Sequence, residues 1–119
     1  MTNFAAELEH VTDYWTPRVV GEVNDQYVKV AKLKGEFVWH AHENEDELFL
    51  IVYGTLVIQL EDREDVVLNA GEFFTVPKGV RHNPVAAEEV GIVLIETKTT
   101  LHTGDVVDER SVPIERQVG

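Results

Sequence analysis

Three histidines and one glutamate fall within two short segments of the sequence, at spacings that suit a shared metal ion. His40 and His42 are separated by one residue, Glu47 follows them, and His82 comes later in the chain. Imidazole nitrogens with one carboxylate suit Mn²⁺, Fe²⁺, Co²⁺, Ni²⁺ or Zn²⁺, whereas Ca²⁺ and Mg²⁺ favour oxygen ligands. These residue types therefore indicate a divalent transition metal. An octahedral ion held by four side chains keeps open positions for water, O₂ or a substrate.

The local pattern explains how these side chains can meet. Residues two apart on a strand share a face, so His40 and His42 project the same way. Glu47 opens an apolar strand after a short acidic loop, which lets the chain reverse direction. Residues 77–79, Pro-Lys-Gly, suit a turn that returns His82 to the same end of the molecule.

Each of these residues alone has an ordinary interpretation. A His-x-His pair is often a surface or core pair, Glu47 borders an exposed acidic loop, and His82 follows a turn. Their joint occurrence favours the metal site. Glu45 is a rival carboxylate in the middle of the loop. The two histidines outside these segments, His10 and His102, are interpreted as surface or packing residues.

The elements that must position these groups are short and rich in β-branched and aromatic residues. Turn residues separate them at intervals of about 8–12 residues, which predicts an all-β sandwich or barrel. No segment after Glu22 has the pattern of a long amphipathic helix, which disfavours a βαβ fold. The expected strands are Arg18–Glu22, Tyr27–Leu33, Glu36–His40, Leu48–Tyr53, Leu56–Leu60, Val66–Leu68, Phe73–Val76, Asn83–Ala86 and Ile92–Thr97.

Two features concern how the sheet is covered. A short helical segment is expected from Asn3 to His10, with Asn3 as its N-cap. The strand Leu48–Tyr53 is apolar on both faces, so both faces should be covered. Its cover is either a second sheet with a partner subunit or the N-terminal segment.

Length and composition limit the class of protein. The 119 residues suffice for one ordinary domain, so a single domain over 1–119 is expected. The net charge of −12 disfavours nucleic-acid and anionic-membrane partners. The absence of cysteine excludes disulfides and thiolate ligands. The first residues lack the apolar stretch of a signal peptide, which predicts a cytoplasmic protein.

The two segments together resemble the motifs of the cupin family over residues 35–86. The first motif is Gly, five residues, His-x-His, three or four residues, Glu, six residues, Gly. The second is Gly, five residues, Pro-x-Gly, two residues, His, three residues, Asn. The chain follows both motifs from His40 to Gly54 and from Gly71 to His82. It departs at Gly35, which is one residue closer to His40, and at Ala86, which replaces the Asn.

This resemblance implies a double-stranded β-helix, or jelly-roll, barrel that is commonly a homodimer and binds a small molecule inside. It also implies metal binding by His40, His42, Glu47 and His82. A fold shared by many chemistries does not select one. The first hypothesis is a metal-dependent enzyme, an isomerase or dioxygenase, acting on a small organic molecule. The expected pocket wall is apolar and consists of Val38, Phe49, Ile51 and Phe74.

Two other functions remain open at this point. A non-catalytic module that senses or stores a metal-chelating metabolite needs the same four ligands but no acid or base nearby. The sequence shows no obvious general base besides those ligands, which keeps this alternative open. A purely structural domain without metal is the third interpretation.

Overall fold

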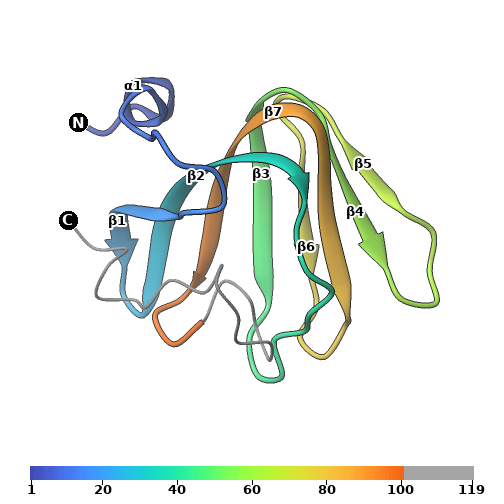
Figure 1. Cartoon of the computed structure of the whole chain (residues 1–119). Helices are drawn as coiled ribbons and strands as arrows, with labels where there is room; N and C mark the ends of the chain where they lie inside the picture. The colour runs from blue at the N-terminus through green and yellow to red at the C-terminus, as the bar shows by residue number, and fades with distance from the viewer. Residues whose placement is uncertain (101–119) are drawn as a thin grey trace.

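The computed structural model describes residues 1–100, so the expectations for His102 and for the rest of the predicted domain beyond residue 100 lie outside it. The described part contains one short helix and seven strands, which confirms the all-β prediction (Figure 1). In this part of the chain no helix is long and apolar enough to cross a membrane. The elements are α1 (Phe4–Glu9), β1 (Arg18–Val23), β2 (Gln26–Glu36), β3 (Glu47–Tyr53), β4 (Leu56–Leu60), β5 (Val66–Leu68), β6 (Phe73–Val76) and β7 (His82–Thr97).

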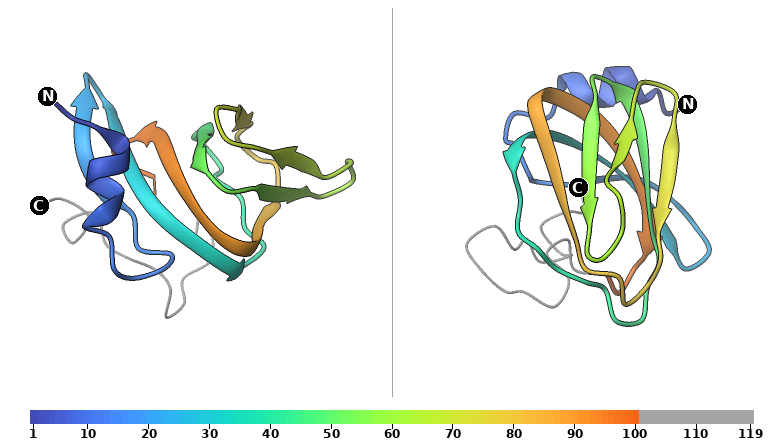
Figure 2. Two further views of the ribbon diagram at one scale, coloured as in Figure 1. Left: turned by 90° about the horizontal axis from the view of Figure 1, so that it is seen from above. Right: turned by 90° about the vertical axis from the view of Figure 1, so that its right-hand side faces the viewer.

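The strands form one antiparallel sheet that curves around a common interior. Its main path runs β1-β2-β7-β3-β6, while β4 pairs with both β5 and β7. The long strand β7 therefore joins the two sides, because it pairs with β2 along nearly its whole length, with β3 along its second half and with β4 at its start. Figure 1 shows this strand arching over the molecule, and Figure 2 shows the β4–β5 hairpin on the side away from β1.

Strands β2 and β7 are longer than the sequence suggested, and their pairing is irregular beside Gly35. This glycine has φ +86°, and the β2–β7 register shifts between Leu33 and Gly35. Between the pairs that these two residues make, residues 87–89 of β7 stand opposite a single residue of β2, so the bulge lies on β7. Strand β2 continues through Lys-Gly, where the turn residues had suggested a break. Likewise β7 runs through both of the strands expected between residues 83 and 97. Gly35 and Ala86, the two departures from the motif pattern, are cross-strand partners here.

The apolar residues divide into an interior core and an outer cluster. The interior core draws on β2 to β7 and includes Phe49, Ile58 and Ile92. The outer cluster lies between α1 and the outside of the sheet, where Leu8 packs with Val30 and half-buried residues of β3 and β7. Figure 2 shows α1 lying along the layer of β1 and β2.

The helix begins where the sequence predicted. The side chain of Asn3 accepts a hydrogen bond from the Ala6 amide at 3.0 Å, which satisfies one of the free amides of the first turn. The N-terminal segment thus provides part of the cover that the outer face of β3 requires.

Candidate metal centre

The side chains of His40, His42, Glu47 and His82 meet inside the barrel. One potential ligand atom from each lies within 4.8 Å of the others, and all four residues are buried. The group could hold a metal ion. Glu47 is the first residue of β3 and His82 the first of β7, while His40 and His42 lie in the connection between β2 and β3. The expected strand over residues 36–40 ends at Glu36, so this connection, and not a strand, carries the two histidines.

The backbone fixes two of the histidines relative to each other. The His40 amide donates to the His82 carbonyl at 3.0 Å, and the His82 amide donates to the His40 carbonyl at 2.8 Å. This isolated antiparallel bridge places the two ring centroids 4.3 Å apart. A second link comes from the Pro-Lys-Gly turn, where the Gly79 amide donates to the His42 carbonyl at 2.8 Å. The predicted turn therefore does bring the second segment back to the first.

Backbone carbonyls also determine which ring nitrogens face the group. Nδ1 of His40 lies 2.8 Å from the Val38 carbonyl, and Nδ1 of His82 lies 3.0 Å from the Val80 carbonyl. A carbonyl oxygen only accepts, so each Nδ1 carries the proton and each Nε2 presents a lone pair. Among the described residues, the buried Nε2 of His40 has no hydrogen-bond partner. A metal ion would satisfy this lone pair.

Glu47 supplies the negative charge of the group. Its Oε1 lies 3.2 Å from Nε2 of His42 and 3.4 Å from Nε2 of His82. Burial alone would raise the pKa of Glu47. The interactions with Glu96, His42 and His82 outweigh burial and hold that pKa well below its usual range. The carboxyl group is therefore ionised at neutral pH.

His40 is suited to bind a cation because its imidazole resists protonation. Burial, followed by the proximity of His82, lowers the pKa of His40 to about 4. A neutral imidazole is the form that coordinates a metal. Neutral imidazoles with one carboxylate, turned toward a common point, fit a divalent transition metal by donor chemistry.

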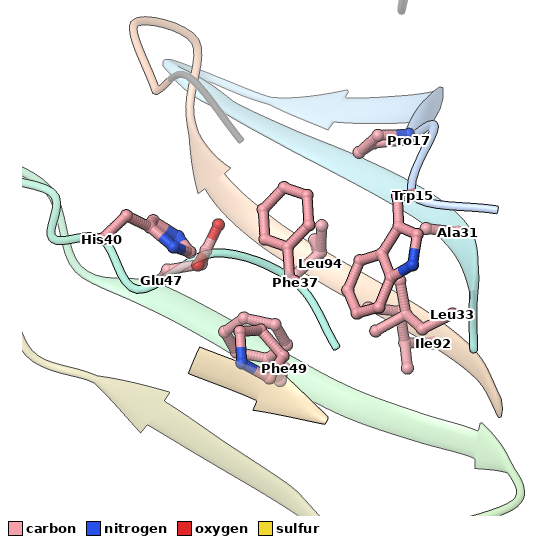
Figure 3. Close-up of a pocket in the computed structure, with 11 residues that line it drawn as sticks. Trp15, Pro17, Ala31, Leu33, Phe37, His40, Glu47, Phe49, Ile92 and Leu94 are labelled. Carbon is pink, nitrogen blue, oxygen red and sulfur yellow. The ribbon is translucent and has the colours of Figure 1, made fainter. Parts of the chain in front are cut away.

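An apolar cavity adjoins the group (Figure 3). Its empty space, including the part that is open to solvent, is about 330 Å³. His40 and Glu47 form its polar end in Figure 3, and Trp15 stacks on Phe37 at 4.7 Å between ring centroids. The lining residues are Trp15, Pro17, Ala31, Leu33, Phe37, His40, Glu47, Phe49, Pro84, Ile92 and Leu94.

The four predicted pocket residues lie at different places. Phe49 lines this cavity. Ile51 is buried in the interior core, and Phe74 packs against that core. Val38 is half-buried, and its carbonyl binds His40. The other candidates of the sequence are peripheral to the group, since His10 is exposed at the C-cap of α1 and Glu45 is half-buried in the loop.

Sequence reasoning missed two parts of the site. Trp15 reaches the cavity from a position with φ +58°, fixed by a hydrogen bond from its Nε1 to the Lys34 carbonyl, which no periodicity signals. The second omission is a buried ion pair between Lys29 and Glu96, 2.7 Å apart. The sequence did contain a signal for this pair, because Lys29 and Glu96 are charged residues at inward positions of otherwise apolar strands.

Comparison with known proteins was made by sequence and by structure. The family described as "Cupin domain" matches residues 26–97. The "Uncharacterized protein YdbB" of Bacillus subtilis is 38% identical over 82 residues, which cover 69% of this chain and 73% of that protein. An acireductone dioxygenase of Bacillus licheniformis is 29% identical over 104 residues, 82% of this chain but only 58% of that protein.

The described fold also matches solved structures. A cupin-2 domain protein from Shewanella frigidimarina NCIMB 400 superposes with a TM-score of 0.79 and 43% identity. The match covers 82% of this chain and 94% of that one. The double-stranded β-helix barrel expected from the two motifs is thereby confirmed.

Proposed function

Because the chain belongs to the cupin family, we propose that it is a metal-dependent enzyme acting on a small, largely apolar organic molecule held in its barrel. The observation that carries this proposal is the apolar cavity whose polar end is formed by His40 and Glu47. A molecule in that cavity lies directly beside the metal-ligating group. Pockets of this kind, apolar with a few convergent polar groups, are typical of small-molecule sites.

The proposed ligands are His40, His42, Glu47 and His82, and the proposed ion is a divalent transition metal. When bound, such an ion would polarise a carbonyl or hydroxyl group of the substrate, or activate O₂. The protein's own contribution is positional. The Nδ1 bonds of His40 and His82 orient the rings, Glu47 balances the charge, and the Trp15–Phe37 stack excludes water from the apolar side.

Of the two reaction types, oxygenation fits the cavity better than isomerisation. Isomerisation by proton transfer needs an acid or base beside the substrate. The described lining offers none besides His40 and Glu47, and it contains no lysine or arginine to bind a phosphorylated sugar. An oxygenase needs open metal positions and an apolar pocket. The similarity to an acireductone dioxygenase supports the same choice.

The test first measures the metal content of the protein and then measures substrate turnover. Elemental analysis should find one transition metal ion per chain in the parent protein and a strong loss in His42→Ala. The loaded protein is then incubated with a panel of small apolar hydroxy-ketones and phenols, in air and without oxygen. Product that requires O₂ and disappears in His40→Ala supports the proposal. Tight binding without product in either atmosphere would replace it with the non-catalytic binding module.

Two further properties stay predictions. A homodimer is expected. Half-buried apolar residues such as Leu50 and Val52 on the outer face of β3 form a surface that a second subunit could bury. Light scattering coupled to size exclusion measures the mass directly. A cytoplasmic location is the other prediction, and cell fractionation tests it.

A further inference from the structure

One wall of the apolar cavity is carried by a segment outside the strands of the barrel. Trp15 lies in the connection between α1 and β1, and its indole ring stacks on Phe37 with the ring planes 10° apart. The ring stands at the end of the cavity away from His40 and Glu47 (Figure 3). The size of molecule that fits beside the metal-ligating group therefore depends on where this one side chain is held.

The edge of β2 holds Trp15 through two hydrogen bonds. The register of β1 with β2 ends at the pair Arg18 and Val30, so the following residues of β2 lie beyond β1 on this side. The Trp15 amide donates to the Lys32 carbonyl at 2.9 Å, and its Nε1 donates to the Lys34 carbonyl at 2.9 Å. Carbonyl groups of a strand need such donors. Trp15 thus takes the place of a partner strand at this point.

The neighbouring residue, Tyr14, is bonded to the outside of the barrel. Its hydroxyl donates to Oε1 of Glu89 at 2.8 Å, and the Tyr53 hydroxyl donates to the other oxygen of the same carboxylate at 2.6 Å. Glu89 belongs to the bulge of β7 that stands opposite Lys34. Tyr14 and Glu89 are both exposed, so their bond lies on the surface, whereas the ring of Trp15 lines the cavity.

The backbone of Trp15 explains why a contact of Tyr14 matters for the ring. Trp15 has φ +58°, a left-handed conformation that a bulky residue rarely adopts. Such a conformation persists only where the surrounding contacts fix it. The bonds of Trp15 to β2 fix it on one side, and the bond of Tyr14 to Glu89 fixes it on the other. Loss of the Tyr14 bond removes one of these restraints and gives the indole ring more freedom to move.

We propose, resting on the small-molecule site proposed above, that Tyr14 and Glu89 are positioning residues that hold Trp15 in the wall of the cavity. Held in this way, Trp15 determines which ring sizes the cavity admits. Neither Tyr14 nor Glu89 is among the described residues that line the cavity, so both act through Trp15 without touching the bound molecule. Two exposed side chains thereby control the selectivity of an interior site.

Two matched variants separate positioning from general stability. Tyr14→Phe removes the hydroxyl group next to Trp15 and keeps the aromatic ring. Tyr53→Phe removes the other hydrogen bond to the same carboxylate, but it leaves the bond from Tyr14 to Glu89 in place. A general loosening of the surface would affect both variants alike. Glu89→Ala removes both bonds and should move Trp15 as Tyr14→Phe does.

The first readout needs neither metal nor ligand. The sequence contains two tryptophans, so a Trp39→Phe background leaves Trp15 as the only one. In this background, acrylamide quenching of the fluorescence measures the access of solvent to the Trp15 ring. We expect roughly a twofold rise of the quenching constant in Tyr14→Phe and Glu89→Ala, because a single exposed polar contact shifts a local equilibrium by a small factor. Tyr53→Phe should keep the value of the background protein.

The second readout is the selectivity of the metal-loaded protein. Calorimetric titration gives the dissociation constants of phenol and of the bulkier 2-naphthol, and their ratio measures discrimination by ring size. Tyr14→Phe should lower this discrimination by roughly two- to fivefold, again the range of one exposed contact. Tyr53→Phe should keep the parent's ratio. Co²⁺ affinity should be unchanged in both variants, because the metal-ligating residues are untouched.

Three results would overturn the inference and leave the proposed function intact. Unchanged quenching in Tyr14→Phe would show that the surface bond does not position Trp15. An equal rise in Tyr53→Phe would indicate general loosening. Raised quenching with an unchanged ratio of dissociation constants would show that Trp15 does not select the ligand. A parent that binds neither phenol nor 2-naphthol would count against the proposed function and the selectivity, whereas the quenching experiment would still decide whether Tyr14 positions Trp15.

Discussion

His40 and His82, from two segments far apart in the chain, are joined by a reciprocal pair of backbone hydrogen bonds at 3.0 and 2.8 Å. The backbone consequently brings their rings together. Each ring is also oriented by its own Nδ1 bond to a backbone carbonyl. The candidate centre is thus preorganised, and its assembly does not depend on side-chain contacts between the ligands.

A preorganised site should make metal binding stabilise the protein without refolding it. Saturation at about 100 times the dissociation constant adds about 2.7 kcal/mol, which corresponds to roughly 10 °C in melting temperature for a domain of this size. We expect this rise in the parent, its reversal by a chelator, and an unchanged far-ultraviolet dichroism spectrum throughout. Differential scanning calorimetry measures the shift.

The matched variants for that experiment are His82→Ala and His10→Ala. The first removes a proposed ligand, so the metal should no longer raise its melting temperature. The second removes an exposed histidine outside the group and should behave like the parent. A full metal-dependent rise in His82→Ala would contradict the proposed ligand set.

The surface bond between Tyr53 and Glu89 predicts a stability change at alkaline pH. The Tyr53 hydroxyl donates to Glu89 at 2.6 Å, and burial together with this bond raises the pKa of Tyr53 to about 12. The raised pKa means that the stabilisation is complete below pH 10 and is lost as the pH rises from 10 toward 12. Urea unfolding at a series of pH values should show this decline in the parent.

Tyr53→Phe isolates that effect. At pH 8 the variant should be slightly less stable than the parent, because the hydrogen bond from Tyr53 to the exposed Glu89 carboxylate is lost. The difference between variant and parent should shrink above pH 10. A difference that stays constant up to pH 12 would mean that the Tyr53 hydroxyl titrates normally in the folded protein.

The Tyr53 ring leaves no room for a side chain at position 91, which is a glycine. A Cβ atom at this position would lie 2.3 Å from the Tyr53 ring, which packs over the glycine. We expect Gly91→Ala to displace the ring and to cost about 1–3 kcal/mol, the usual range for overpacking. In a Tyr53→Ala background the same substitution should cost much less. Chemical denaturation of the four proteins of this double-mutant cycle measures the coupling, and strict additivity would contradict the close approach.

The sequence predicted the parts of this molecule that follow from local rules. The N-cap at Asn3 follows from residue type and local spacing. The set of candidate ligands follows from the spacing of the two motifs, although a connection and not the expected strand carries His40 and His42. The length of β2 could not be foreseen, because a glycine such as Gly35 can form a turn or lie within a continuing strand, and only the pairing with β7 decides between them. The position of Glu96 opposite Glu47 likewise depends on cross-strand register.

The position of Trp15 at the cavity also could not be foreseen from local sequence rules. Its indole ring lines the cavity and stacks on Phe37 with an interplanar angle of 10°. Removing it in Trp15→Ala should widen the cavity toward solvent. Because the side chain is half-buried, the expected loss of stability is about 2 kcal/mol, below the 3–5 kcal/mol typical of a fully buried aromatic residue.

The control is Trp15→Phe, which retains an aromatic ring against Phe37 but loses the hydrogen bond from Nε1 to the Lys34 carbonyl. If the stack limits the size of the bound molecule, Trp15→Ala should bind bulkier aromatic ligands than the parent does, whereas Trp15→Phe should keep the parent's selectivity. Calorimetric titration of the metal-loaded proteins with phenols of increasing ring size measures this difference. Because the metal-ligating residues are untouched, Co²⁺ affinity should be the same in all three proteins. Identical ligand selectivity in all three would show that the bound molecule does not reach the Trp15 side of the cavity.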